Sequence, residues 1–556
     1  MVRPRLRPLG DAGLVAEFGG DEISEEANAA VRALRDALET RRPPCVLETV
    51  PTYRSLLIVY DPLRAAAAEI RAAVLDAAER ADPSRVPQGR LIEIPCAYGG
   101  PHGPDLATVA AETGLGESDV IALHTGQEFH VYMLGFAPGF PYMGVLPPRL
   151  RVARLASPRT RVPGRSVAIA GQQTGIYPTE SPGGWRLIGR TPLRIYDPAR
   201  PTPFLLDAGD RVRFVSISPA DYERQAPGEE VASSPPSSAS PDLVVEQGGL
   251  FTTVQDLGRP GYRRFGLPQS GAMDPLALRV TNLLLGNPQD AAALEFTFPG
   301  PRLVATARTS IALGGADFSP LLNGQPIPLW TALALREGDI LGFGTPRRGQ
   351  WGYLAVPGGV NVPLMLGSRA TYIPGALGGC GGRRLQRGDR LSASKRSPAA
   401  QLGLPAQRAP VIGGDCDLRV VVGPQDEYFV EDAARALTNG HYHVSPEADR
   451  VGYRLNGPPM ARGTQSELLS DGILPGAIQV PSGGQPIVIM PDGPTTGGYP
   501  KIAVIVGPDV RRLAQARRIE TIRFQAVDWD DARGAVRDEA TYLASLAFES
   551  PDDAAC

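Results

Sequence analysis

The chain has 556 residues, of which 42% are hydrophobic and 21% charged, and its formal net charge is -3. This length indicates roughly three or four domains, and the near-neutral charge argues against a nucleic-acid-binding protein. The N-terminus lacks the apolar core of a signal peptide, and no run approaches the roughly 20 apolar residues of a membrane span, so we expect a cytoplasmic protein.

Residues 1–86 alternate strand and helix patterns, which predicts a small α+β domain. The predicted helices carry apolar residues every three or four positions, and Ser24 precedes the first as its N-cap. The predicted strands are LVAEF (14–18) and SLLIVYD (55–61), and the predicted helices are SEEANAAVRALRDALE (24–39) and LRAAAAEIRAAVLDAAERA (63–81).

Residues 87–225 change to short apolar runs separated by glycine and proline, which is typical of a closed or sandwiched β domain. One helix is predicted at DLATVAAETG, with Asp105 as its cap. The Pro/Ser-rich stretch 226–241 has no apolar periodicity and is predicted to be a linker. The strand candidates are RLIEIPCAYGG (90–100), VAIAG (167–171), PLRIYD (192–197) and RVRFVSIS (211–218).

The β-rich, glycine-punctuated style resumes after the linker. A weaker break at 395–410 predicts two β domains, 242–400 and 401–535, followed by a C-terminal helix or tail at 536–556. Helical pieces are predicted at PLALRVTNLLLG (275–286) and DEYFVEDAARALT (426–438).

The linker separates a first unit, residues 1–225, from a second unit, residues 242–556. A short pattern occurs once in each unit, as Gly183-Gly184-Trp185 and Gly497-Gly498-Tyr499. VPGRSVAIAG precedes the first copy and VPSGGQPIVIM the second, and downstream AGDRVRFVSIS resembles RRIETIRFQAV. We therefore predict that 87–225 and 401–535 are distant copies of one fold. A Gly-Gly pair lets backbone N–H groups approach a ligand closely, whereas the alternative is a tight turn packed on its own barrel.

Further binding candidates in the first unit surround its Gly-Gly pair. The aromatic-rich segment 130–144 either lines a binding surface or plugs the mouth of a barrel. Arg159 and Arg161 lie two residues apart, so in an extended segment both could bind a carboxylate or phosphate, although a solvated arginine face is the alternative. Neutral hydrogen-bonding residues suited to an amide follow. The candidates are Phe136, Pro138, Gly139, Phe140, Tyr142, Gln172, Thr174, Gly183, Gly184 and Trp185.

The second unit adds polar residues in loop-like sequence. Asp274 precedes a proline and either caps a helix or acts in the site. Lys501 is one of two lysines in a chain with 54 arginines, so the position requires an amine; it could stabilise an oxyanion or act as a base. The binding candidates are Gln255, Asp256, Arg259, Arg450, Thr495, Thr496, Gly497, Gly498 and Tyr499.

Cysteine and histidine spacing predicts neither disulfides nor a metal site. The five cysteines are scattered without a CxxC pair, and buried or incidental thiols are expected. Cys380, in GALGGCGGRR, is the one alternative, a loop nucleophile. The phosphate loop GxxxxGK[ST] and the GxGxxG fingerprint do not occur in the sequence.

Two groups of motifs resemble known families. GFAPGFPYMG, SPRTRVPGRSVAIAG and SPGGWRLIGRTP resemble the B subunit of bacterial 5-oxoprolinase, also described as allophanate hydrolase subunit 1 or KipI. TTVQDLGRPGY, SGAMDPLAL, GSRATY, DRVGYRLNGP, GAIQVPSGGQPI and TTGGYPKIA resemble the C subunit, also described as allophanate hydrolase subunit 2 or KipA. The chain is thus similar to a natural B–C fusion.

The resemblance implies a mainly β protein with cyclophilin-like β-barrel domains, preceded by a small α+β (ferredoxin-like) domain. It implies an enzyme component that acts with a LamB/YcsF-like A subunit and uses ATP with Mg2+ to open the cyclic amide 5-oxo-L-proline to glutamate. Two alternatives follow from the same resemblance. One is a carboxyltransferase that moves a carboxyl group from biotin on a separate carrier to urea, and the other is an inhibitor of a sensor histidine kinase.

Under the leading hypothesis the catalytic residues are Lys501, Arg159, Arg161 and Asp274, with the binding candidates above around them. A homo-oligomer remains one option for the assembly. The Lys501→Ala variant is expected to lose turnover while its melting temperature stays within a few degrees.

Overall fold

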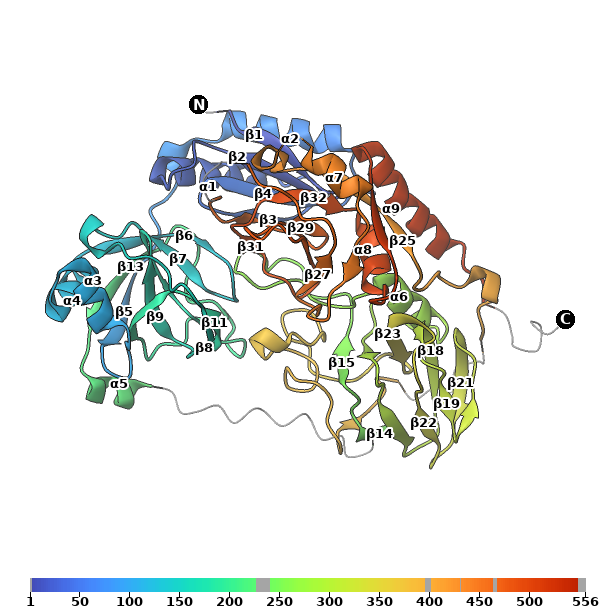
Figure 1. Ribbon diagram of the computed structural model, residues 1–556. Helices are drawn as coiled ribbons and strands as arrows, with labels where there is room; N and C mark the ends of the chain where they lie inside the picture. The colour runs from blue at the N-terminus through green and yellow to red at the C-terminus, as the bar shows by residue number, and fades with distance from the viewer. Residues whose placement is uncertain (1–2, 227–240, 396–401, 431, 464–467, 549–556) are drawn as a thin grey trace.

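The computed structural model describes residues 3–226, 241–395, 402–430, 432–463 and 468–548. Residues 227–240 of the linker predicted at 226–241, and 396–401 of the break predicted at 395–410, therefore lie outside the described residues. Figure 1 shows a first barrel at the left, the N-terminal domain at the top, a second barrel beside it and a further β domain at the lower right. The predicted fold class, mainly β with α+β and cyclophilin-like barrels, is confirmed.

The N-terminal domain is a four-stranded antiparallel sheet with strand order β1-β2-β4-β3, packed against two helices. Ser24 caps the first helix by accepting a hydrogen bond from the Ala27 amide at 3.2 Å, as predicted. The topology is that of a ferredoxin-like β-α-β-β-α-β unit with its last strand moved to the front. The elements are β1 (Arg5–Leu9), β2 (Gly13–Glu17), α1 (Glu25–Thr40), β3 (Val46–Pro51), β4 (Ser55–Tyr60) and α2 (Ala67–Arg80).

The first barrel closes with the strand order β10-β7-β6-β13-β5-β12-β9. The strand predicted at PLRIYD does not form: 192–197 is an irregular loop that buries Ile195 and Tyr196, and Pro192 has no N–H to donate to a ladder. The elements are β5 (Leu91–Tyr98), α3 (Leu106–Thr113), α4 (Glu117–Thr125), β6 (Glu128–Leu134), β7 (Pro141–Gly144), β8 (Arg159–Val162), β9 (Ser166–Ala170), β10 (Gln173–Ile176), β11 (Ser181–Gly183), β12 (Arg186–Arg190), β13 (Arg211–Ser216) and α5 (Pro219–Gln225).

His124 makes the stability of this barrel depend on pH. Its imidazole is buried between the Tyr98 hydroxyl, at 2.7 Å, and the Thr174 hydroxyl, at 2.9 Å, and burial lowers its pKa to about 3. Below about pH 6.5 the unfolded chain binds a proton that the folded barrel excludes, so stability falls as the pH drops. Between pH 7 and pH 5 we expect the protein to lose about 2 kcal/mol more stability than the His124→Gln variant.

Thermal melts of both proteins at pH 7, 6 and 5 measure this difference. His441→Gln is the matched control, because His441 is exposed and its substitution leaves the buried imidazole in place. Parallel pH profiles for the protein and His124→Gln would contradict the assignment of a buried neutral imidazole.

Residues 242–395 form two sheets around a shared core, with strand orders β20-β19-β22-β17-β14-β24 and β15-β16-β23-β18-β21. The predicted helix at 275–286 is α6. The elements are β14 (Leu243–Gln247), β15 (Phe251–Gln255), α6 (Pro275–Leu283), β16 (Ala293–Thr297), β17 (Arg302–Ala305), β18 (Thr309–Asp317), β19 (Leu321–Leu322), β20 (Gln325–Pro326), β21 (Thr331–Leu335), β22 (Ile340–Gly342), β23 (Arg348–Ala355) and β24 (Arg390–Leu391).

The second barrel has the strand order β26-β27-β30-β29-β32-β25-β33, and a bridge between Tyr442 and Ile522 connects its two ends. The C-terminal helix begins earlier than predicted, at Trp529, because Asp528 caps it. The elements are β25 (Cys416–Val422), α7 (Ala433–Asn439), β26 (His443–Val444), β27 (Gly452–Asn456), β28 (Asp471–Gly472), β29 (Ala477–Gln479), β30 (Ile487–Ile489), β31 (Thr496–Gly497), β32 (Lys501–Ile505), α8 (Gly507–Ala514), β33 (Ile522–Ala526) and α9 (Trp529–Ala544).

The two barrels share one topology, which supports the predicted repeat. Read around the barrel from β6 and from β26, the strands of both follow the same order. In both, the last strand in the sequence, β13 or β33, pairs parallel with the first strand in the sequence, β5 or β25. The Gly-Gly turns are also equivalent, because β11 pairs with β8 as β31 pairs with β28. One predicted correspondence is wrong: VAIAG forms β9, whose counterpart is β29, whereas IVIM forms β30, the counterpart of β10.

The N-terminal domain packs against the second barrel, although the two are far apart in the sequence (Figure 1). Leu9, Val15 and Leu57 share a buried cluster with Leu474 and Val504. The Trp529 indole donates to the Gly10 carbonyl at 2.9 Å. Among the described residues, none forms a helix long and apolar enough to cross a membrane.

Candidate functional site

The loop between β6 and β7 joins the first barrel to the second unit. The Gly139 amide donates to the Phe265 carbonyl at 2.7 Å, and Leu134 forms a parallel bridge with Phe265. Phe265 also stacks on Phe204 of the first unit, with ring centroids 4.4 Å apart and nearly parallel planes. The aromatic segment and the loop after β15 are therefore in direct contact.

The same loop also contacts the second barrel next to its Gly-Gly turn. A side chain at Gly135 would overlap the Thr496 hydroxyl, so the Thr496 side chain lies against the Gly135 backbone as closely as glycine allows. Leu469 packs on the aromatic cluster of the first barrel, and the Tyr142 hydroxyl interacts with the Ser470 side chain. The structure thus brings together three segments that the sequence singled out: 135–142, 255–274 and 495–499.

Gly135→Ala tests this close approach. The new methyl group must displace Thr496, and overpacking of this kind costs about 1–3 kcal/mol. Because the Thr496 hydroxyl has no hydrogen-bond partner among the residues described, Thr496→Ala alone should change stability little. We expect the double variant to melt higher than Gly135→Ala. Equal melting temperatures for the single and double variants would contradict the contact.

Most of the aromatic residues are buried, but in a cluster separate from the core of the first barrel, so the structure shows them packed on protein without showing that they plug its mouth. The Phe140 ring lies 5.5 Å from the Trp185 ring and 4.9 Å from the Tyr142 ring, and all three side chains are buried. Phe136 differs, because it is 40% exposed and has a left-handed backbone with φ of 62°. Tyr499, in the second Gly-Gly turn, is 50% exposed. These two rings are the members of the predicted set that a ligand or partner could touch.

Arg159 and Arg161 are bound to different carboxylates. Arg159 donates to Asp105 at 2.7 Å, whereas the largely exposed Arg161 pairs with Glu180 at 2.6 Å. Asp105 was expected to cap α3, but its carboxylate instead accepts hydrogen bonds from Arg159 and from the Leu187 amide. Asp105 therefore fixes the β8 strand onto β12, beside the first Gly-Gly turn.

Other predicted residues of the first barrel occupy different environments. The Thr174 hydroxyl lies inside the barrel, bonded to His124 and to the Ala168 carbonyl at 3.2 Å. Gln172 lies in the turn between β9 and β10, and its carbonyl accepts the Leu146 amide. Pro138 lies in the loop against Gly375 of the second unit.

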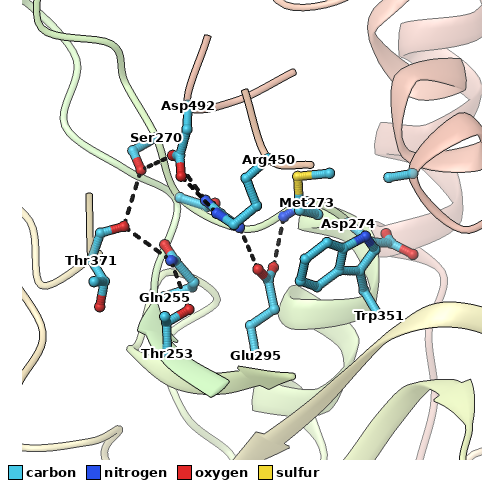
Figure 2. A network of polar contacts seen from close by, with 12 residues as sticks. Thr253, Gln255, Ser270, Met273, Asp274, Glu295, Trp351, Thr371, Arg450 and Asp492 are labelled. Carbon is cyan, nitrogen blue, oxygen red and sulfur yellow. Dashed lines mark hydrogen bonds and ion pairs between the residues drawn. The ribbon is translucent and has the colours of Figure 1, made fainter. Parts of the chain in front are cut away.

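A buried polar network connects residues 242–395 to the second barrel (Figure 2). The Arg450 guanidinium lies 2.7 Å from Asp492 and also pairs with Glu295 on β16. Ser270 donates to Asp492 and to the Thr371 carbonyl. Burial lowers the pKa of Arg450, but the two carboxylates more than offset this, and its pKa is raised. Arg450 therefore stays a cation that bridges two domains.

Glu295 and Asp492 are central to this network and were not among the predicted site residues. The Glu295 carboxylate accepts a hydrogen bond from the Met273 amide at 2.7 Å (Figure 2). It also accepts one from the Tyr353 hydroxyl at 2.7 Å. Burial raises its pKa. A glutamate within the apolar run AALEFTF was the available sequence signal, because a buried charge needs a partner.

Arg259 and its neighbours carry unused hydrogen-bonding atoms. Arg259 is fully buried; it donates to the Ala370 carbonyl, but its Nε and Nη1 have no partner within the described ranges. Burial lowers its pKa. Gln255 Oε1 and the Tyr196 hydroxyl also have no hydrogen-bond partner within the described ranges. Tyr196 belongs to the first unit and interacts electrostatically with Arg259. Both carboxylate oxygens of Asp256, in contrast, accept hydrogen bonds: one from the Gly258 amide and the Ser368 hydroxyl, the other from the Arg369 amide.

Asp274 is occupied as a cap. One carboxylate oxygen accepts from the Ala277 amide at 3.0 Å, and the other accepts from Gln515 at 2.9 Å. The residue is fully buried. This geometry matches the capping alternative for Asp274.

Lys501 begins β32 and has no exposed surface. Its ammonium lies 3.4 Å from Asp471, which also accepts hydrogen bonds from Ser55 of the N-terminal domain and from Gln425. Burial alone would raise the pKa of Asp471, but Lys501 and the hydrogen bonds outweigh it and hold the pKa below its usual range. The expected stability of Lys501→Ala does not fit this geometry, because removing the amine leaves a buried carboxylate unpaired.

Cys380 is not suited to act as a nucleophile. It is buried, and burial raises its pKa to about 11, so the thiolate is scarce at neutral pH. The cysteines of the described ranges, Cys45, Cys96, Cys380 and Cys416, are all free and buried, as expected.

Both halves of the chain match carboxyltransferase domains. Residues 265–526 match the family model "Carboxyltransferase domain, subdomain A and B", and residues 4–206 match "Carboxyltransferase domain, subdomain C and D". Together with the relatives described next, these matches show that the chain belongs to the carboxyltransferase-domain family, with the B-type half first and the C-type half second.

Within this family the halves are similar to two components of 5-oxoprolinase. The chain is 38% identical to the C subunit of 5-oxoprolinase from Escherichia coli K12, over 55% of its own length and 98% of that protein. It is 41% identical to the B subunit of 5-oxoprolinase from Bacillus subtilis, over 40% of its length and 96% of that protein. The crystal structure of TTHA0988 covers 92% of the chain, with 38% identity and a TM-score of 0.81.

Urea amidolyases are related as well. The Lachancea kluyveri enzyme is 33% identical over 51% of the chain, but this match spans 17% of the enzyme. The homologues thus place the chain among components of 5-oxoprolinase-like and urea-carboxylating enzymes.

Proposed function

We propose that this chain is the fused B and C component of an ATP-dependent 5-oxoprolinase, which opens 5-oxo-L-proline to L-glutamate together with a LamB/YcsF-like A subunit. One observation carries the proposal: the two halves match almost the whole length of two separate 5-oxoprolinase components, the B subunit and the C subunit. The larger urea amidolyase, in contrast, has most of its length outside the match. The chain therefore has the extent of the two components combined.

The proposed site lies where 135–142, 255–274 and 495–499 meet. Phe136 and Tyr499 supply exposed aromatic surface. The unpaired donors of Arg259 and Tyr196, with the Gln255 oxygen, provide polarity at the same junction. Arg159, Asp274, Arg450 and Lys501 are already bound to protein groups, so we propose that they position the site rather than react.

The cavity beside Ser270 is smaller than a typical nucleotide site. That cavity has a volume of about 250 Å³, below the roughly 300–1,000 Å³ typical of sites for drug-sized ligands, and a nucleotide is a ligand of that size. Searched over its described residues, the chain has no group of three His, Cys, Asp or Glu side chains that could hold a metal ion. We therefore derive no step through the nucleotide and propose the A subunit or its interface as its location.

Reconstitution tests the proposal. The purified chain, mixed with an A subunit, ATP, Mg2+ and 5-oxo-L-proline, should release glutamate. Omitting the chain, the A subunit or ATP should each abolish release. If the complete mixture forms no glutamate with any A subunit that copurifies with the chain, the proposal is wrong.

A carboxyltransferase reaction is the second candidate, because the matched models of both halves carry that description. Under it, the chain would move a carboxyl group from biotin on a separate carrier to urea or a related amide. Incorporation of labelled bicarbonate into urea, dependent on a biotin carboxylase and a biotinylated carrier, would support it. Glutamate release without any biotinylated component would contradict it.

A further inference from the structure

A cavity of about 250 Å³ lies between the first turns of α6 and α8, next to the buried polar network. Pro275 and Arg279 of α6 and Gly507 and Arg511 of α8 line it. Ser270, which belongs to the network of Figure 2, is part of its wall. The cavity is therefore adjacent to the junction at which the predicted segments meet.

The wall of this cavity is positively charged. Arg263, Arg279 and Arg511 line it, and its described lining residues include no aspartate or glutamate. Two of these arginines have carboxylate partners behind the wall. Arg263 pairs with Glu48 of the N-terminal domain, and Arg511 lies 2.8 Å from Glu539 on α9.

Arg279 is the exception. The residue is half-buried; in the part of the chain that the structure describes no ion pair includes it, and its Nε is buried without a hydrogen-bond partner. A buried donor left unpaired is costly, and a guanidinium presents its N–H groups in a fork that matches carboxylate or phosphate oxygens. Because Arg279 lines the cavity, an anion bound there would lie beside its guanidinium and balance its charge.

Size restricts the ligand. The volume holds several water molecules or one small metabolite, since a water molecule occupies about 30 Å³ in the liquid. Water in the cavity would leave the charge of Arg279 without a counter-ion, whereas a small oxyanion would supply one. The occupant that best matches this arginine-lined wall is therefore a small oxyanion.

We propose that this cavity is a binding site for a small oxyanion, a carboxylate or a phosphate, with Arg279 as the residue that pairs with it. The proposal extends the proposed function and rests on it for one point: the carboxylate of 5-oxoproline is such an anion, whereas urea is neutral. A site built around Arg279 then favours an amide that carries a carboxylate over one that does not.

Isothermal titration calorimetry at constant ionic strength tests the site, with inorganic phosphate, 5-oxo-L-proline and 2-pyrrolidinone as probes. The last is the same ring without the carboxylate. The variants are Arg279→Met, which removes the charge, and Arg279→Lys, which keeps one. Arg308→Met is the matched control, because Arg308 is exposed and does not line the cavity. Thermal melts without ligand verify that each variant folds.

We expect Arg279→Met to weaken phosphate binding about tenfold or more, Arg279→Lys to weaken it less, and Arg308→Met to leave it unchanged. Binding of 5-oxo-L-proline but not of 2-pyrrolidinone, in competition with phosphate, would identify the carboxylate as the natural group. Phosphate binding lost in Arg279→Met without any 5-oxoproline binding would support the anion site and count against the proposed substrate.

Equal phosphate affinity in the unmodified protein and Arg279→Met, or no binding of either anion, would overturn the anion site. The reconstituted assay is independent of this result. Glutamate release that persists unchanged in Arg279→Met would leave the proposed function in place and refute Arg279 as a substrate contact.

Discussion

Arg450→Met lowers the stability of the protein more than a surface substitution can. The change removes the cation between two buried carboxylates, Asp492 and Glu295, and also the hydrogen bond to the Gly271 carbonyl. Breaking a buried ion pair by removing one partner costs about 3–5 kcal/mol. We expect the apparent melting temperature to fall by about 6 °C or more.

Arg454→Met is the matched control, since Arg454 lies four residues further on and is exposed. Its melting temperature should stay close to that of the unmodified protein, because surface substitutions usually change stability by less than about 0.5 kcal/mol. If both variants melt together, the network of Figure 2 does not hold the two domains as described.

Lys501→Met should be strongly destabilising as well, and a second substitution should rescue it. The single change leaves Asp471 buried with its hydrogen bonds but without its cation, at a cost of about 3–5 kcal/mol. In Lys501→Met/Asp471→Asn the uncompensated charge is absent. We expect the double variant to recover at least half of the loss, measured as a double-mutant cycle of thermal melts at pH 7.

Lys395→Met is the control for the same substitution at the other lysine, which is exposed. Lys501→Arg should also lower stability, by about 1–3 kcal/mol, because a fully buried site must expand to hold a guanidinium. A stable Lys501→Met variant that lacks only activity would instead favour the catalytic amine that the sequence suggested.

Low pH should weaken this pair. The pKa of Asp471 lies below its usual range in the folded protein, so its contribution is complete above the pKa of an unfolded aspartate, about 3.9. The contribution is lost as the pH falls through the lower folded value. In Lys501→Met, burial raises the pKa of this carboxyl, and acid should then weaken the variant less steeply than the unmodified protein.

Local patterns allowed much of the fold to be predicted. Apolar spacing and caps identified α1, α2 and α6, because helix periodicity and N-caps act over a few residues. PLRIYD was mistaken for a strand, since its apolar residues are buried from a loop and composition does not separate the two cases. The repeat was recognised from its Gly-Gly turns, but one flanking strand was paired wrongly, because a short apolar run fits either of two neighbouring strands.

The candidate site was predictable by segment but not by role. The motif-rich loops do meet, yet the sequence gives no sign that Arg159 would bind Asp105 or that Lys501 would bind Asp471. Such pairs join residues 54 and 30 positions apart and depend on how the sheets close. Arg279 was not predicted as a site residue for the same reason, because its lack of a partner can be known only once its neighbours in the fold are known.

The packing of the N-terminal domain on the second barrel has a consequence for synthesis. Leu9, Val15 and Leu57 find their partners, Leu474 and Val504, more than 400 residues later in the chain. At about 5–20 residues per second, a ribosome takes roughly 20–80 s to make the intervening sequence. During that interval the first domain presents an uncovered apolar face, so its nascent form is the stage at which chaperones or premature aggregation would act.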